Sequence, residues 1–200
     1  MSWRAVVCVA LGYLLGAFPT GALLGRLAGV DLRQRGSGST GATNVLRVLG
    51  PGAGALVLAV DIGKGWLAAT MARRWAGPAG APLAGLAAVV GHNYSVFLGG
   101  RGGKGVATGL GTLLALSPRA LLLGAAAGLP AIALTRHVSL GSLVGTTTAA
   151  AAVGEHALAG RQPAAYWLYA LGASGLIWYA HRENIARLRA GTERRLGERA

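Results

Sequence analysis

The chain has 200 residues, of which 53% are hydrophobic and only 12% are charged, about half the charged share of an ordinary soluble domain. This composition excludes a typical soluble globular domain and indicates a membrane protein. The formal net charge is +13, but the basic residues lie mostly between apolar stretches, so we expect anionic headgroups or anionic substrates as partners and no nucleic acid. The single cysteine, Cys8, excludes an intrachain disulfide or a cysteine-based zinc framework.

Seven apolar segments follow one another along the chain, at 3–25, 52–72, 79–98, 105–117, 119–135, 138–155 and 164–181. A full bilayer span needs about 20 residues, so 105–117 and 119–135 are short and form a hairpin, tilted helices or re-entrant elements. We predict an all-α integral membrane protein: a polytopic bundle of about seven transmembrane helices, some short, with glycine-rich cytoplasmic or re-entrant loops. Residues 1–200 form one membrane-embedded domain, in which 182–200 is a basic cytoplasmic tail.

The distribution of basic residues predicts the orientation of the bundle. Only Arg4 lies at the N-terminal end of the first segment, whereas Arg26, Arg33 and Arg35 follow the segment, which is the reverse of a signal peptide. With seven spans and the N terminus outside, the inside loops hold thirteen basic residues, Arg199 among them, and the outside loops hold five. This orientation places three unusual segments on the cytoplasmic side. They are 36–50, 91–108 and 181–197.

The first of these segments, GSGSTGATNVLRVLG at 36–50, is rich in glycine and in hydrogen-bond donors. Glycines let backbone N–H groups approach an anion, and an arginine guanidinium suits phosphate. If 42–49 is helical, Thr43 and Arg47 share one face. We therefore predict a phosphate site here, and the alternative is a flexible, solvated connector. The residues singled out are Gly36, Ser37, Thr43, Asn44 and Arg47.

The second segment, GHNYSVFLGGRGGKGVATGLG at 91–111, surrounds Arg101 and Lys104 with glycines and then enters an apolar helix. This order suits a phosphate cradle at a helix N terminus, with His92 as acid, base or hydrogen-bond donor. The alternative is a tight interfacial turn with snorkelling bases and a satisfied polar His92. The glycines singled out are Gly102, Gly103 and Gly105.

The third segment, HRENIARLRAGTERRLG at 181–197, places His181 and Asn184 on one helix face, with Arg187 one turn further on. Its alternative is a basic helix end that binds lipid headgroups.

Charged and hydroxyl residues also occur inside the apolar segments. Asp61 and Lys64 stand three residues apart, where isolated charges are costly, so they form a structural ion pair or Lys64 lines an anion site. Ser139 and Ser142 add donors from a neighbouring span or hold helices together.

The sequence lacks the residue patterns that several common catalytic and metal-dependent reactions require. HExxH, GxSxG and a Cys/His metal set do not occur, and no histidine has an aspartate five positions further on. We therefore expect no metal and no cofactor, and a site that works by holding phosphates.

Together and in this order, the three segments resemble one family, the bacterial membrane acyl-phosphate:glycerol-3-phosphate acyltransferases called PlsY. The resemblance implies acyl transfer from acyl phosphate to the 1-hydroxyl of glycerol 3-phosphate, which gives lysophosphatidate and phosphate. It also implies that Ser37 and Arg47 are essential, that the second glycine loop binds glycerol phosphate, that His181 and Asn184 are needed for activity, and that Glu193 is structural. The chain departs from the family pattern at Ser39, usually asparagine, and at Gly100, often aromatic.

The resemblance further implies a multi-pass protein of the bacterial inner membrane with a cytoplasmic site, in contact with membrane lipid, and we expect a monomer. Arg47, Lys104 and also Lys64 and Arg101 are the candidate phosphate cations. The proton of the glycerol hydroxyl passes either to His181, positioned by Asn184, or to a phosphate oxygen of the donor. Ser37 as a covalent acyl carrier is a further hypothesis. The alternative functions are a small transporter of an organic phosphate and a non-catalytic scaffold.

Overall fold

The computed structural model describes residues 2–198, so Arg199, which was counted among the inside bases, lies outside the described residues. The described chain is helical and contains no strand. Its helices are α1 (Trp3–Ala17), α2 (Thr20–Leu27), η1 (Leu32–Gln34), α3 (Ala42–Leu49), α4 (Pro51–Ala76), α5 (Gly80–Asn93), η2 (Val96–Leu98), α6 (Val106–Leu116), α7 (Pro118–Thr135), α8 (Val138–Leu158), α9 (Ala165–Ala180) and α10 (Arg182–Arg189).

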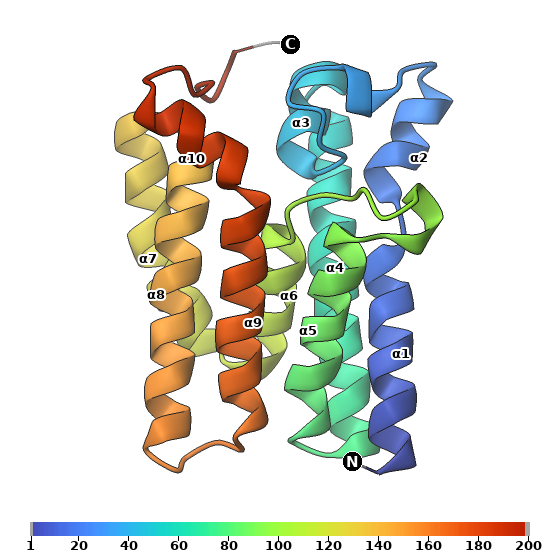
Figure 1. Cartoon of the computed structure of the whole chain (residues 1–200), viewed down its shortest axis with the longest axis vertical. Helices are drawn as coiled ribbons and strands as arrows, with labels where there is room; N and C mark the ends of the chain where they lie inside the picture. The colour runs from blue at the N-terminus through green and yellow to red at the C-terminus, as the bar shows by residue number, and fades with distance from the viewer. Residues whose placement is uncertain (1, 199–200) are drawn as a thin grey trace.

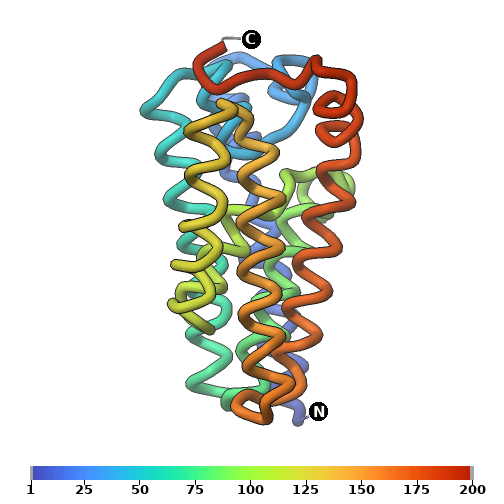
Figure 2. The backbone as a smooth tube through the Cα atoms, turned by 90° about the vertical axis from the view of Figure 1, so that its left-hand side faces the viewer, coloured from blue at the N-terminus to red at the C-terminus, as the bar shows by residue number. Residues whose placement is uncertain are grey.

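The long helices form two groups that run side by side (Figures 1 and 2). One group contains α1, α4 and α5, and the other contains α7, α8 and α9. The helix α6 packs against α4 and α5 on one side and against α7 on the other, and α5 also contacts α9. The short helices α2, α3 and α10 gather at one end of the bundle, opposite the N terminus.

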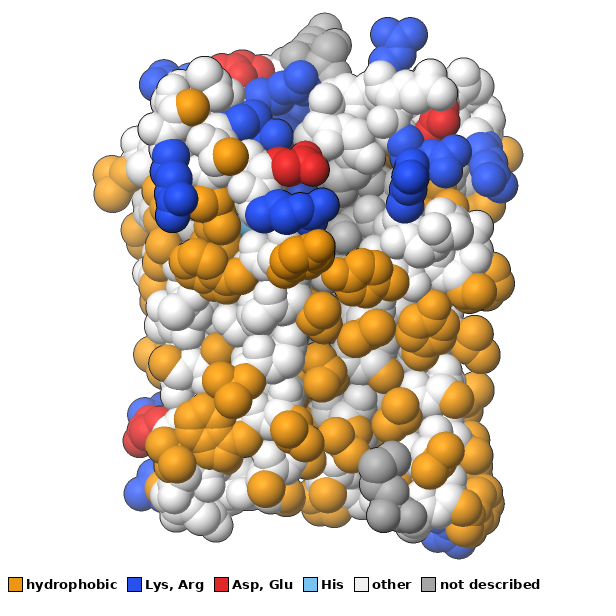
Figure 3. Space-filling view, in the orientation of Figure 1, with side chains coloured by type: hydrophobic (Ala, Val, Ile, Leu, Met, Phe, Trp, Pro, Cys, Tyr) orange, Lys and Arg blue, Asp and Glu red, His pale blue; other side chains and the backbone are white. Residues whose placement is uncertain are grey.

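The surface fits a membrane-embedded bundle. Figure 3 shows a broad apolar belt below a band of Lys and Arg side chains at the end that carries α3 and α10. Within residues 2–198, four stretches are long and apolar enough to cross a bilayer, namely Trp3–Leu27, Pro51–Ala76, Gly80–Leu98 and Pro118–Thr135. The all-α membrane fold is therefore confirmed. A helix covers each of the seven predicted segments, but a count of seven spans is not confirmed.

The structure adds detail to two parts of the predicted sequence of segments. The run 3–25 is interrupted at Phe18–Pro19, because proline cannot donate the helical hydrogen bond and disfavours helical geometry in the residue before it. The break leaves the Phe18 carbonyl oxygen free to accept a hydrogen bond from Lys64. Of the alternatives for 105–135, the structure shows a helical hairpin that turns at Ser117, whose Oγ accepts from the Ala120 N–H at 3.3 Å.

Close approach of α4 and α6 fixes the position of the segment that begins at residue 105. A Cβ atom at Gly111 would lie 1.9 Å from the carbonyl oxygen of Ile62, and one at Gly65 would lie 2.0 Å from that of Thr108. Small residues at such contacts are the usual means by which membrane helices pack tightly. The N terminus of α6 is therefore held firmly against α4.

We predict that Gly111→Ala destabilises the protein, because its new methyl group must push the α4 backbone away. Overpacking of this kind costs about 1–3 kcal/mol. The control is Gly63→Ala, whose methyl group would meet nothing within 4 Å. Thermal unfolding in detergent should show a clear fall in Tm for Gly111→Ala and little change for Gly63→Ala. Equal Tm values would contradict this account of the α4–α6 contact.

Candidate functional site

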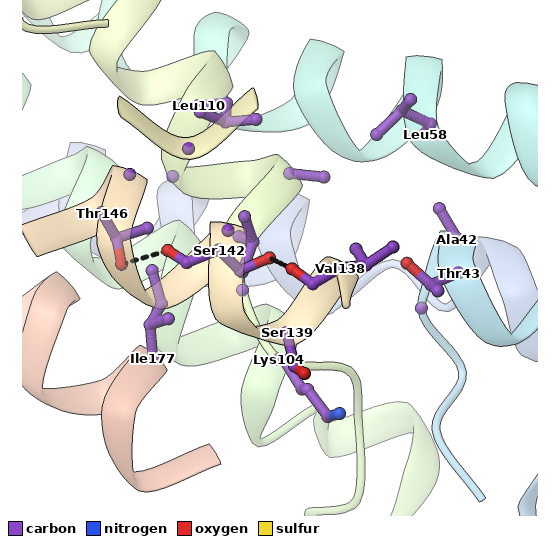
Figure 4. Close-up of a pocket in the computed structure, with 18 of the residues that line it drawn as sticks. Ala42, Thr43, Leu58, Lys104, Leu110, Val138, Ser139, Ser142, Thr146 and Ile177 are labelled. Atoms are coloured by element: carbon purple, nitrogen blue, oxygen red, sulfur yellow. Dashed lines mark hydrogen bonds between the residues drawn. The ribbon is translucent and has the colours of Figure 1, made fainter. Parts of the chain in front are cut away.

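A cavity of about 720 Å³ opens among α3, α4, the start of α6, and α7 to α10. Its lining is polar at the basic end of the bundle and apolar further in, where α6 to α9 contribute most of the surface. Figure 4 shows this mixture, with Thr43, Lys104, Ser139 and Ser142 near Leu58, Leu110 and Ile177. The predicted site residues that line the cavity are Ser37, Thr43, Asn44, Arg47, His92, Lys104, Gly105, Ser142, His181, Asn184 and Glu193.

The cavity thus brings together the four residues that we predicted to be catalytic. Ser37 and Arg47 come from the first segment, and His181 and Asn184 come from the third. Five other predicted site residues do not line it. They are Gly36, Lys64, Arg101, Gly102 and Gly103. Arg101 is exposed on the surface loop, and Lys64 is buried beside a second, much smaller cavity at the α1–α2 break.

Asn44 holds the first segment in shape. Its side-chain oxygen accepts from the Ser37 N–H at 2.8 Å, and its amide nitrogen lies 2.8–3.2 Å from the carbonyl oxygens of Leu32, Arg35 and Ser39. The side chain is 1% exposed. Because these contacts occupy its amide group, Asn44 organises the loop and leaves the contact with a ligand to its neighbours.

Next to this loop lies the helix that we considered at 42–49. The helix α3 covers Ala42–Leu49, so the conditional prediction of a helix at 42–49 is confirmed, and Thr43 and Arg47 both face the cavity. Arg47 is half-buried and makes no hydrogen bond or ion pair with another described residue. Its guanidinium group is therefore available to an anion.

The unusual Ser39 also has a structural explanation. Its Oγ accepts from the Gly41 N–H at 3.2 Å, which is a turn that an asparagine side chain makes equally well. Gly100, the second departure from the family pattern, lies in an exposed turn with a φ of 78° and does not line the cavity. Ser39 lines the cavity and offers a hydroxyl group there, whereas Gly100 lies away from it.

The glycines of the second segment pack this loop against the end of α5. The Gly102 N–H donates to the Asn93 carbonyl at 2.9 Å, and the Gly103 N–H donates to the His92 carbonyl at 3.0 Å. These two N–H groups therefore pair with α5 and do not form the open cradle that we expected. Within the part of the chain that the structure describes, His92, Lys104, Gly105 and the N-terminal half of α6 bring this segment to the cavity.

A continuous set of hydrogen bonds joins the second and third segments. Lys104 Nζ donates to Asn184 Oδ1, and Asn184 Nδ2 donates to Glu193 Oε1. Glu193 also accepts from Ser139 Oγ and from Arg187 Nε, each at 2.8 Å. Glu193 thus fixes the amide of Asn184 and the start of α8, which is the arrangement expected of a structural residue.

The ionisation of these groups follows from their surroundings. Burial raises the pKa of Glu193, but hydrogen bonds from Asn184, Arg187 and Ser139 outweigh burial and lower it. Burial lowers the pKa of Lys104 to about 8; the Glu193 charge opposes this shift, and the Arg187 charge adds to it. Lys104 is therefore charged at neutral pH and loses its proton only slightly above it.

His181 stands at the junction of α9 and α10 and is 3% exposed. Its Nδ1 lies 2.8 Å from the Ile177 carbonyl oxygen, so Nδ1 carries the proton and Nε2 is a free acceptor. Burial, reinforced by the charge of Lys104, lowers the pKa of His181 to about 4. The imidazole is therefore neutral at physiological pH.

The charged pair inside α4 forms a structural ion pair. Lys64 Nζ lies 2.8 Å from Asp61 Oδ1, and both side chains are almost fully buried. The same ammonium group contacts His92 Nδ1. On α8, Ser142 Oγ donates to the Val138 carbonyl at 2.8 Å while still lining the cavity (Figure 4).

The sequence interpretation missed the apolar part of the cavity. Glycines of α7 and α8 line it and bring these two helices together, since a Cβ at Gly128 would lie 2.6 Å from the Gly141 carbonyl oxygen. Gly124 and Gly145 form a second such contact. The spacing of four residues between glycines in each helix is a small-residue packing pattern that was available in the sequence.

Comparisons with known proteins agree with this geometry. The family described as Glycerol-3-phosphate acyltransferase matches residues 6–191. A protein of that name from Symbiobacterium thermophilum is 49% identical over 95% of this chain and 94% of its own length. Another, from Thermus thermophilus, is 52% identical over 98% of this chain and 96% of its own length.

Two solved structures are also similar. The crystal structure of PlsY, an integral membrane glycerol 3-phosphate acyltransferase, in its glycerol 3-phosphate form has a TM-score of 0.89 at 42% identity and covers 96% of both chains. The lysophosphatidic acid form has a TM-score of 0.85 at 41% identity and covers 96% of this chain and 95% of that one. The chain therefore belongs to the glycerol-3-phosphate acyltransferase family and shares the PlsY membrane fold that its three motifs predicted.

Proposed function

We propose that this enzyme transfers a fatty acyl group from acyl phosphate to the 1-hydroxyl of glycerol 3-phosphate, which yields lysophosphatidate and phosphate. The observation that carries the proposal is the division of one cavity into a cationic end and an apolar end. The proposed product has the same two parts, a phosphate head and an acyl tail. The solved relatives in glycerol 3-phosphate and lysophosphatidic acid forms support the acceptor and the product.

The cationic end suits the phosphates of the two substrates. Arg47 is free to bind an anion, and Lys104 lies beside the first turn of α6, whose N–H groups favour negative charge. The acyl chain then extends along the apolar lining of α6 to α9. We assign substrate contacts to Ser37, Thr43, Arg47, Lys104, Gly105, Ser142, His181 and Asn184.

Acyl phosphate is an activated donor, so the protein mainly has to align the two substrates and stabilise developing charge. The glycerol oxygen attacks the acyl carbon, the bond from that carbon to the phosphate oxygen breaks, and the hydroxyl proton passes to the departing phosphate. His181 Nε2 accepts a hydrogen bond from the hydroxyl and orients it. We favour this role because burial makes His181 a weak base.

Ser37 fits a donor to phosphate better than a covalent acyl carrier. A nucleophilic serine needs a base in hydrogen-bond contact, and no described histidine or carboxylate makes one with Ser37 Oγ. Asn44 instead holds the backbone of Ser37, which presents the hydroxyl at a fixed position.

The basic band supports a cytoplasmic site with the N terminus outside, in the bacterial inner membrane. We also propose a monomer that works without metal or cofactor; among the described residues no group of three His, Cys, Asp or Glu side chains could hold a metal ion.

The purified protein in detergent should convert acyl phosphate and glycerol 3-phosphate to phosphate and lysophosphatidate in equal amounts. This assay has no separate compartments, so it distinguishes an enzyme from a transporter. The control is Arg101→Ala, because Arg101 is exposed and away from the cavity and should leave the rate unchanged. Absence of product, together with uptake of glycerol 3-phosphate into proteoliposomes, would refute acyl transfer.

We predict that kcat/KM falls as the pH rises through about 8, because the Lys104 ammonium, with its pKa lowered to about 8, then loses the charge that attracts phosphate. The measurement is a pH profile of kcat/KM from pH 6 to 10. Lys104→Arg, whose guanidinium stays charged, should move this decline to higher pH. An unchanged decline in the variant would mean that another group titrates.

His181→Gln tests the proton acceptor. If His181 only orients the hydroxyl, the variant keeps most of its rate, because a general base contributes about 10²–10⁴-fold. Its pH profile should also keep the wild-type shape. A rate loss of that size, with loss of an acid limb, would identify His181 as the base instead. Tm measurements on both proteins control for misfolding.

A further inference from the structure

The hydrogen bonds of Lys64 leave it no means of binding a substrate phosphate. Its Nζ atom lies 2.8 Å from Asp61 Oδ1, 2.8 Å from His92 Nδ1 and 3.3 Å from the Phe18 carbonyl oxygen. An ammonium group has three N–H bonds, and these acceptors use all three. The Lys64 side chain is 6% exposed and does not line the main cavity. Lys64 therefore acts on its neighbours and not on a ligand.

The contact with Lys64 decides which nitrogen of His92 carries the proton. The ion pair with Asp61 keeps the Lys64 ammonium charged, so Lys64 donates and His92 Nδ1 accepts. A neutral imidazole that accepts at Nδ1 must carry its proton at Nε2. The distance from His92 Nδ1 to Asp61 Oδ1 is 3.7 Å, too long for a competing hydrogen bond. His92 Nε2–H is therefore a donor of fixed orientation.

This donor lies against Gly103, where only a glycine leaves room for the imidazole ring. A Cβ atom at Gly103 would lie only 2.1 Å from His92 Nε2. Nε2 makes no hydrogen bond with any described residue, although the His92 side chain is only 8% exposed. A shielded N–H group without a partner is costly unless a partner is supplied.

The surroundings indicate which oxygen would bind there. His92 lines the main cavity, as do Lys104 and Gly105, which follow Gly103 in the chain. Asp61 lines the cavity as well, but its charge is offset by Lys64. The donor thus lies against the residue that precedes Lys104, the cation that we assign to phosphate, and both side chains line the same cavity.

We infer that His92 donates a hydrogen bond to a phosphoryl oxygen of a substrate, and that Lys64 and Asp61 are positioning residues that fix its tautomer. The inference rests on the proposed function, because it takes the ligand of the cationic end to be phosphate. Glycerol 3-phosphate and acyl phosphate both present such oxygens, so KM must be measured for each.

Two substitutions of His92 separate the two ring nitrogens. The amide group of His92→Asn lies near the position of Nδ1 and keeps an acceptor for Lys64, but it removes the donor at Nε2. The amide nitrogen of His92→Gln lies near the position of Nε2 and keeps that donor, but it loses the contact with Lys64. We expect His92→Asn to raise KM for one substrate by about tenfold or more, as for other hydrogen bonds to charged groups. His92→Gln should stay within about threefold of the wild-type KM.

A purely structural His92 predicts the opposite order. His92→Gln would then lower Tm and activity, and His92→Asn, which keeps the Lys64 contact, would resemble the wild type. That order, or wild-type KM values in both variants, would overturn the inference. In the proposed arrangement, adding Lys64→Met to His92→Asn raises KM no further, since Lys64 acts on KM only through the ring.

A binding measurement separates this inference from the proposed function. Glycerol 3-phosphate should raise the Tm of the wild type and of His92→Gln, and it should raise that of His92→Asn less at the same concentration. If the wild type shows these shifts but forms no lysophosphatidate, the proposed reaction fails and the donor role stands. If acyl transfer is present and His92→Asn equals the wild type both in its Tm shift and in its KM for each substrate, the donor role fails and the reaction stands.

Discussion

The contact between Lys104 and Asn184 connects the two helix groups across the cavity, and the arrangement of the site depends on it. Lys104 belongs to the loop between α5 and α6, whereas Asn184 belongs to α10 beyond α9. Glu193 holds the other end of the Asn184 amide, so the amide has only one orientation. A half-buried lysine whose pKa is lowered by desolvation needs such a partner when no anion is bound.

The same arrangement explains how a membrane enzyme can work without a strong base. In the proposed reaction the acyl donor carries a good leaving group, so the rate depends on holding two charged substrates near one another. Cations at a partly buried site interact more strongly with phosphate than they would in water. In that proposal the neutral His181 and the hydroxyl groups of Ser37 and Thr43, which all line the cavity, need only orient the reacting atoms.

Much of this architecture was predictable from local sequence. The helix at 42–49, the membrane fold and the meeting of the first and third segments follow from spacing and from the distribution of charge. Pro19 is a signal for the break that the sequence contains. The apolar run continues on both sides of it, however, and was therefore predicted as one segment. The roles of Gly102 and Gly103 were not predictable, because glycine is needed both where a loop binds an anion through its N–H groups and where two backbone segments pack closely. The structure shows the second case. The link from Lys104 to Asn184 spans 80 residues and depends on tertiary packing alone.

The amide of Asn44 makes its hydrogen bonds within the loop that it holds. The loop is therefore ordered before any substrate arrives, and its loss of conformational entropy belongs to folding and not to binding. Asn44 stands in the motif that we assign to substrate binding. It contributes to affinity indirectly, because it stabilises the folded shape of the loop that presents the binding groups. The loop that we assign to the substrates is in that sense part of the folded core, although it lies at one end of the bundle and is rich in glycine, serine and threonine.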